Sequence, residues 1–178
     1  LYVHPTSTGG VITSAGGAFG ATLSLNGNRT FIVNEAGIIN DLVVTVGIVN
    51  GDATARSLTK QSIGTMVMQG ANTYTGSTFV DRGLLVLDYS LVNGDSKLSN
   101  SSATTLRGGA LELRSNGTAA TTEVTSSLSI TNGSNRLTLT SVNGQDLTFS
   151  LTGGISRSAN AGVLDIQSND FSKTTISV

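Results

Sequence analysis

The chain has 178 residues, of which only 12% are charged and 4% aromatic, and its formal net charge is −1. Such a dispersed, nearly balanced charge excludes the basic surface that nucleic-acid and anionic-membrane binders need. The absence of cysteine excludes disulfides, thiol nucleophiles and cysteine zinc sites. A hydrophobic content of 38% is too high for a disordered tract. We therefore expect one folded domain over residues 1–178, without an internal linker.

Short segments of alternating polar and apolar residues recur along the chain. Glycine or asparagine interrupts them about every ten residues, which is too often for helices, and their period of two is that of strands. Asn-Gly pairs begin at Asn26, Asn50, Asn93, Asn116, Asn132 and Asn143. Positive φ costs little at such pairs, so they indicate turns. The sequence predicts an all-β protein with strands at 21–25, 30–33, 42–46, 65–68, 84–87, 110–113, 128–130, 137–140, 147–151 and 163–166.

A β-sandwich, a barrel and a β-solenoid all agree with this pattern. The antiparallel β-sandwich is favoured by residues 22–33 and 137–151, which resemble hairpins around Asn-Gly pairs. The scarcity of aromatic residues disfavours it, because large rings usually fill the space between two sheets. Small aliphatic residues suit the narrow interior of a solenoid, where like residues stack from one rung to the next. Periodicity alone leaves both architectures open.

An internal repeat favours the solenoid. Gly64, Gly83 and Gly109 each precede a strand of the same form. Repeat periods of about 20–30 residues, with a strand at a fixed phase, are typical of solenoids, and both intervals between these glycines fall close to that range. The second, longer interval leaves room for a polar surface loop at residues 93–102.

Residues 58–87 resemble the autotransporter passenger-associated β-strand repeat. The likeness is most specific in Gly-Ala-Asn-Thr-Tyr-Thr-Gly at residues 70–76, between a Leu-Thr-Lys start and a Gly-Leu-Leu-Val-Leu strand. The sequence departs from the repeat at Ser62, where the pattern has glycine, and at Met66, Met68 and Leu84. The resemblance implies a right-handed parallel β-helix on a bacterial cell surface. With roughly 20–25 residues in each rung, the chain would form about seven to nine rungs.

The chemistry-bearing residues give little support to an active site. His4 is the only histidine, and the Gly-rich run 16–20 has neither the lysine nor the following helix of a phosphate loop. Asp146 and Asp165 are separated by nearly one expected rung and could stack on successive rungs, whereas Asp81, Asp88 and Asp95 recur at every seventh position, which is not a rung spacing. Calcium binding at residues 93–95 or 169–170 is disfavoured, because the Gly-Gly-x-Gly-x-Asp run of calcium-binding β-rolls is absent. For Asn72 and Tyr74 we expect a structural role at a corner of the chain.

We therefore expect no catalytic, cofactor-binding or metal-binding residues, and no cofactor. The expected function is a rigid, extracellular, structural stalk or scaffold of a bacterial cell-surface or adhesin-like protein. Open solenoid ends would permit self-association into filaments, and a host or matrix surface is a possible partner. Nucleic acid is not expected as a partner, and no apolar run is long enough to insert this segment in a membrane. Because no signal-like segment follows Leu1, we expect a section of a mature protein. The alternatives are a carbohydrate-binding or polysaccharide-processing β-helix and a tailspike-like trimer.

Overall fold

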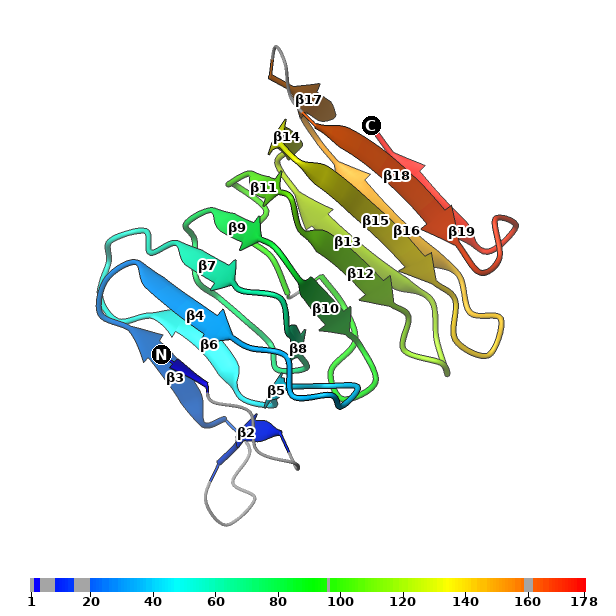
Figure 1. Ribbon diagram of the computed structural model, residues 1–178. Helices are drawn as coiled ribbons and strands as arrows, with labels where there is room; N and C mark the ends of the chain where they lie inside the picture. Colours follow the sequence, from blue (N-terminus) through cyan, green and yellow to red (C-terminus); the bar gives the residue numbers. More distant parts are fainter. Residues whose placement is uncertain (1, 4–8, 15–19, 96, 159–161) are drawn as a thin grey trace.

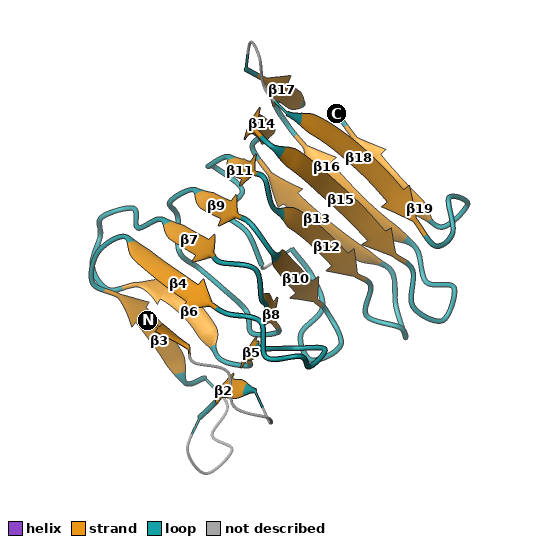
Figure 2. Cartoon of the chain, in the orientation of Figure 1, coloured by secondary structure: helices purple, strands orange, loops and turns teal. Residues whose placement is uncertain are grey.

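A computed structural model describes residues 2–3, 9–14, 20–95, 97–158 and 162–178. All strand pairs in this part of the chain are parallel, and each strand pairs with strands about one rung away in sequence. The strands lie side by side in stacked layers, with β2 and β3 at one end and β17 to β19 at the other (Figures 1 and 2). The prediction of a parallel β-solenoid is confirmed, and the antiparallel sandwich is wrong.

Two seven-stranded sheets form the main walls of the coil. Sheet A contains β1 (Tyr2–Val3), β4 (Arg29–Val33), β7 (Leu58–Gln61), β9 (Thr78–Asp81), β11 (Thr104–Arg107), β14 (Leu128–Asn132) and β17 (Ile155–Arg157). Sheet B contains β2 (Gly10–Ile12), β5 (Leu42–Val44), β8 (Thr65–Met68), β10 (Leu84–Asp88), β12 (Ala110–Arg114), β15 (Ser134–Thr140) and β18 (Val163–Ser168). The chain alternates between the two sheets as it coils.

The third wall is interrupted. Sheet C pairs β3 (Thr22–Leu25) with β6 (Gly47–Asn50), and sheet D contains β13 (Thr121–Thr125), β16 (Leu147–Leu151) and β19 (Thr174–Ser177). Between these sheets, the described residues of two successive rungs cross the third wall without strands, at residues 70–77 and at residues 89–95 and 97–103. The backbone ladder of this wall is therefore broken in the middle of the coil.

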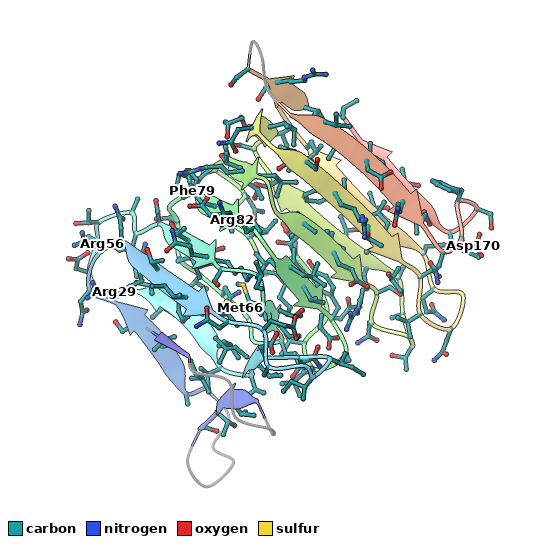
Figure 3. The ribbon with its side chains drawn as sticks, viewed as in Figure 1. Arg29, Arg56, Met66, Phe79, Arg82 and Asp170 are labelled. Atoms are coloured by element: carbon teal, nitrogen blue, oxygen red, sulfur yellow. The ribbon has the colours of Figure 1, made fainter. Side chains whose placement is uncertain are left out.

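Like residues stack along the interior. One inner column of sheet B is Leu42, Met66, Leu85, Leu111 and Leu137, all fully buried and in register on successive rungs (Met66 is labelled in Figure 3). At about 25 cal/mol per Å² of apolar surface, burial of these aliphatic columns is the main stabilising term. Backbone hydrogen bonds between rungs fix the register of the columns. The core is thus a continuous aliphatic rod inside the coil.

The coil makes about six turns, fewer than the seven to nine rungs expected. The difference arises because the later rungs are longer than assumed: Leu84 faces Ala110 on the next rung, and Arg136 faces Asp165. The hairpins that the alternative sandwich would have at residues 22–33 and 137–151 are not formed. β3 and β4 belong to different sheets, as do β15 and β16, so the Asn-Gly pairs between them turn corners of the coil.

Candidate functional site

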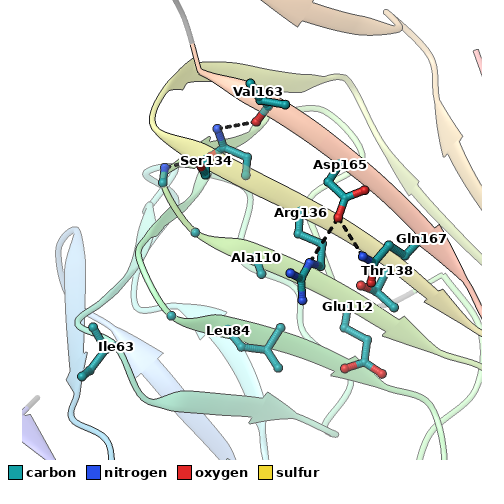
Figure 4. A pocket seen from close by; sticks show the side chains of 14 residues that line it. Ile63, Leu84, Ala110, Glu112, Ser134, Arg136, Thr138, Val163, Asp165 and Gln167 are labelled. Carbon is teal, nitrogen blue, oxygen red and sulfur yellow. Dashed lines mark hydrogen bonds and ion pairs between the residues drawn. The ribbon is translucent and has the colours of Figure 1, made fainter.

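A groove with a volume of about 810 Å³ lies on the outer face of sheet B (Figure 4). We call it the sheet B groove. It crosses strands β10, β12, β15 and β18, so that it runs along the axis of the coil. Its lining residues are Ile63, Gly83, Leu84, Gly108, Gly109, Ala110, Glu112, Ser134, Asn135, Arg136, Thr138, Val163, Asp165 and Gln167.

Strand alternation places the groove side chains. Because successive side chains point to opposite faces, the neighbours of the inward-facing Leu85, Leu111 and Leu137 point outward. The outward residues form two columns in register: Leu84, Ala110, Arg136 and Asp165 in one, and Val86, Glu112, Thr138 and Gln167 in the other. The floor is therefore apolar on β10 and becomes polar towards β18.

Glycine and asparagine shape the edge of the groove. A Cβ on Gly109 would lie 2.7 Å from Val80 Cγ1, so only glycine fits against the preceding rung. On the next rung Asn135 is buried, and its amide donates to the carbonyl oxygens of Asn132, Gly133 and Val163 while its Oδ1 accepts from the amide of Gly108. One asparagine thus ties three rungs together at this corner.

Both carboxylates of the groove are ion-paired. Arg114 donates to Glu112 through two nitrogens, at 2.8 and 3.0 Å, and Thr140 donates to Glu112 Oε1 at 2.9 Å. Asp165 lies 3.5 Å from Arg136 Nε and accepts a bond from Gln167 (Figure 4). Arg136 and Asp165 are both more than half exposed, so their pair is weak. The groove therefore presents charged groups that can form hydrogen bonds, and each of its two carboxylates is paired with an arginine.

Asp146 and Asp165, whose spacing allowed for stacking on successive rungs, do not stack. Asp146 directly precedes β16 of sheet D and pairs with Lys173 at 3.1 Å, whereas Asp165 lies on β18 of sheet B. The spacing of the two acids is shorter than a rung of this part, where Arg136 pairs with Asp165 and Thr121 pairs with Leu147. Asp81, Asp88 and Asp95 lie at the end of β9, at the end of β10 and in the following loop, as scattered positions should.

The remaining candidates form no cluster. Among the described residues there is no group of three or more His, Asp or Glu side chains that could hold a metal ion. Asp170 accepts from the amide and hydroxyl of Ser172, and Asn169 bonds both backbone groups of Ser141. His4 and residues 16–19 lie outside the described residues. The membrane prediction is a separate matter: in the part of the chain that is described, no helix is long and apolar enough to cross a membrane.

Asn72 and Tyr74 lie where the third wall has no strands. Asn72 Oδ1 accepts from the amide of Ile48 on the preceding rung at 2.8 Å, and its Nδ2 donates to the carbonyl of Lys97 on the following rung at 3.0 Å. The Tyr74 hydroxyl is buried, 2.6 Å from Thr78 Oγ1. The backbone amides of the two residues that follow Asn72 also donate to the carbonyl of Ile48. The Asn72 side chain extends this connection to the following rung, so the structural role expected for Asn72 and Tyr74 is confirmed.

Glu123 continues this connection one rung further. Its carboxylate is fully buried and accepts from the amides of Lys97 and Leu98 and from the hydroxyl of Tyr89, the last at 2.6 Å. Lys97 Nζ lies 5.0 Å from the centre of the Tyr89 ring and donates to the carbonyls of Gln69 and Val92. We call Asn72, Tyr74, Tyr89, Lys97 and Glu123 the polar bridge.

Burial shifts the ionisation of the polar bridge. It raises the pKa of Glu123 to about 7, although the hydroxyl of Tyr89 and the two amides act in the opposite direction. It lowers the pKa of Lys97 to about 8, against the attraction of Glu123 and Asp88. No sequence signal indicated Tyr89, Lys97 or Glu123, because each stands alone in an ordinary polar or alternating segment. Lys97 lies in the predicted surface loop 93–102, whose centre is in fact buried.

The matching segment can now be placed in the fold. Residues 58–87 match the family model of the passenger-associated-transport-repeat. The chain carries this repeat. No curated protein and no solved structure matches the chain. The repeat together with the β-solenoid fits an autotransporter passenger, a structural domain of a secreted or surface-exposed kind.

The repeat spans β7, β8, β9 and β10, which is one strand pair of sheet A and one of sheet B. Its central Asn72 and Tyr74 belong to the polar bridge. Met66 and Met68, which depart from the usual pattern, are buried in the core, where a flexible apolar side chain is tolerated. Ser62 adopts a φ of 74°, the left-handed conformation for which glycine is normally used.

Proposed function

We propose that the chain is a rigid, non-catalytic scaffold segment of a bacterial cell-surface protein. The main support for this proposal is the continuous ladder of parallel strands in sheets A and B, which surrounds an unbroken aliphatic core. Each rung is held by its neighbours, so stability adds along the axis and length can change without redesign. The ion-paired carboxylates of the sheet B groove support a role other than acid–base catalysis, and the repeat supports presentation outside the cell.

Removal of one rung tests the scaffold. Because Arg136 is in register with Asp165, deletion of residues 136–164 removes one rung and joins equivalent positions. The shortened protein should remain folded, monitored by far-ultraviolet circular dichroism, with a small-angle-scattering length reduced by about 5 Å. The control deletion, residues 136–163, is one residue shorter and places the inward side chains of β18 outward. It should destabilise the terminal rung. If both deletions destabilised the protein to the same extent, the proposal that rungs can be removed as units would be contradicted.

We further propose that the scaffold self-associates through its C-terminal rung. Ile166 continues the inner column of Leu111 and Leu137, yet it is 42% exposed because no described rung follows β18. Val163 and Phe171 at the same end are 65% and 72% exposed. Unpaired backbone beside an exposed apolar column is a surface onto which a rung of a second copy could stack. Repeated stacking of this kind would produce filaments.

Sedimentation velocity and electron microscopy test the association. The purified chain should form concentration-dependent rods, and Ile166→Asp should return it to monomers because it places a charge in the stacking column. Ile39→Asp is the matched control, since Ile39 is 83% exposed on a loop away from this end. A chain that stays monomeric at millimolar concentration would contradict self-association and leave the scaffold role in place.

A further inference from the structure

A second groove, of about 650 Å³, lies on the outer face of sheet A. We call it the sheet A groove; its lining residues are Ile32, Gln61, Ser62, Asp81, Arg82, Arg107 and Asn132. Gln61, Asp81, Arg107 and Asn132 occupy equivalent outward positions at the ends of four successive strands. At about 4.8 Å for each rung, they form a polar column about 14 Å long, parallel to the axis.

Directly after this column, the backbone of four rungs turns with positive φ. Gly108 and Gly133 have φ of 80° and 70°, as expected where an L side chain would be strained. On the two preceding rungs, however, the corner positions carry Ser62 at 74° and Arg82 at 83°. A left-handed arginine costs on the order of 1 kcal/mol relative to glycine, so its side chain calls for an explanation.

Ser62 is explained by the fold, but Arg82 is not. The hydroxyl of Ser62 donates to Asn34 Oδ1 at 2.7 Å. The side chain of Arg82 is exposed and, within the described part of the chain, makes no hydrogen bond or ion pair. It projects from the corner after β9, near Phe79 (Figure 3). Arg82 is therefore a strained cation without a side-chain partner among the described residues, and it lies at the edge of the groove.

Further donors surround Arg82. Arg107 lies on the next rung, with its guanidinium carbon 4.0 Å from the centre of the Phe79 ring and its Nε 3.4 Å from Asp81 Oδ1. Beneath the corner, the buried Nζ of Lys60 donates to the carbonyl of Arg82 at 3.0 Å. Arg107 is thus held in place by stacking, and the corner concentrates positive charge in a chain whose overall charge is −1.

We propose that the sheet A groove binds an acidic oligosaccharide lying along the axis of the coil. Arg82 and Arg107 pair with the anionic groups of the sugar chain, since a planar guanidinium recognises carboxylate and sulfate by paired hydrogen bonds. The amides of Gln61 and Asn132, which have no partner within the described residues, meet hydroxyl groups as donors and acceptors. Asp81 pairs with Arg107 and so keeps that guanidinium at the edge of the groove.

The position of the groove favours a glycan over a polypeptide or a nucleic acid. The groove crosses a sheet face whose backbone groups are already paired, so an extended peptide finds no edge to join. Two arginines, one of them paired with Asp81, are too few for a nucleic acid, whose binding depends on many phosphate contacts. A sugar chain brings its own alternating hydroxyl and anionic groups, which match the column of side chains.

Titration calorimetry of the whole chain tests the proposal with three probes: oligogalacturonate as a carboxylated glycan, heparin oligosaccharide as a sulfated one, and neutral dextran. We expect at least one acidic glycan to bind, more weakly as salt is added, and dextran not to bind. Arg82→Gly should weaken this binding by about tenfold or more, through loss of a charge-assisted contact. This variant should fold, because it introduces the glycine that the next two rungs use.

Arg136→Gln is the matched control, because it removes one exposed arginine from the sheet B groove instead. It should leave the affinity unchanged. Preference for the carboxylated or for the sulfated probe would identify the anionic group. The proposal is overturned if neither acidic glycan binds, if Arg82→Gly binds as tightly as the parent chain, or if polyglutamate of equal length binds as tightly as the glycan.

Discussion

The hydroxyl of Tyr89 donates a 2.6 Å hydrogen bond to Glu123 Oε2 across a separation of 34 residues. Tyr89 directly follows β10, and Glu123 lies at the centre of β13, where it faces the interior. The bond joins β13 of sheet D to the second of the two rungs whose described residues form no strand on the third wall. A side-chain network thus holds the coil together where the backbone ladder is interrupted.

Replacement of Glu123 should therefore destabilise the protein strongly. Glu123→Ala leaves the buried amides of Lys97 and Leu98 and the hydroxyl of Tyr89 without their acceptor, and we expect a loss of about 3 kcal/mol in the free energy of unfolding. Glu112→Ala, on the outer face of the preceding strand β12, removes a partly exposed ion pair and should cost only about 1 kcal/mol. Urea unfolding measures both. Equal losses for the two variants would show that Glu123 has no special role.

The same carboxyl should make stability depend on pH. Burial raises the pKa of Glu123 from 4.5 to about 7, so the folded protein binds its proton more tightly than the unfolded chain does. This favourable contribution is fully present below pH 4.5 and is lost as the pH rises through 7, at about 1.4 kcal/mol for each unit of pKa difference. Urea midpoints between pH 5 and 8 should fall with pH in the parent chain. A slope that persists unchanged in Glu123→Gln would assign it to other groups.

The two buried lysines should act in the alkaline range. Burial lowers the pKa of Lys60 and of Lys97 to about 8, so the folded state releases their protons before the unfolded state does. Stability should therefore rise as the pH increases from 8 towards 10.5. Urea unfolding of Lys60→Met, which keeps most of the length of the side chain without its charge, should show a smaller rise over this range. An identical rise in the variant and the parent chain would contradict the assignment.

Asn72 should contribute more to the stability of the fold than its neighbour Thr73. Asn72→Ala removes the partners of the Ile48 amide and the Lys97 carbonyl, and we expect a loss of about 2 kcal/mol. Thr73→Ala, at an exposed position of the same segment, should change stability by less than about 0.5 kcal/mol. Thermal unfolding of the two variants checks this difference. Similar melting temperatures would mean that the asparagine of the repeat is not part of the bridge.

Glycine is required at the start of β10. Gly83 has a φ of 64°, and a Cβ there would clash with Lys60 Nζ and lie 2.5 Å from the carbonyl oxygen of Gly64. We expect Gly83→Ala to cost roughly 3 kcal/mol through backbone strain and overpacking together. Gly144→Ala isolates the strain, because its φ is 71° but no atom lies within 4 Å of the added carbon. It should cost only about 1 kcal/mol, also measured in urea.

The sequence predicted sheet B better than the other walls. All ten predicted strands overlap observed ones, and the related strands after Gly64, Gly83 and Gly109 are neighbours in sheet B. Their inward residues are leucine and methionine, so alternation is visible. The strands not predicted include β7, β9 and β13, whose inward positions hold Lys60, Thr78 and Glu123. A buried polar side chain breaks the alternation that reveals a strand, and its partner lies a rung away in sequence.

The corners and the grooves could not be predicted either, because both depend on contacts between residues about one rung apart in sequence. An Asn-Gly pair indicates a turn, but whether the next strand pairs with the last one or enters another sheet depends on contacts about one rung away. The sheet A groove likewise depends on register, because Gln61, Asp81 and Arg107 belong to three different rungs and meet only when the rungs stack. The structural role of Asn72 was predictable because the resemblance placed it at a corner.

Disulfide formation between introduced cysteines tests the stacking of the rungs most directly, since the chain contains no cysteine of its own. Thr122 on β13 and Thr148 on β16 face each other in register on the outside of sheet D. Neighbouring rungs about 4.8 Å apart are within disulfide range. The pair Thr122→Cys and Thr148→Cys should therefore oxidise rapidly within one chain, whereas Thr122→Cys with Thr175→Cys, two rungs away in the same column, should stay reduced. Free thiols in the first pair, or equal oxidation of both, would contradict the parallel coil.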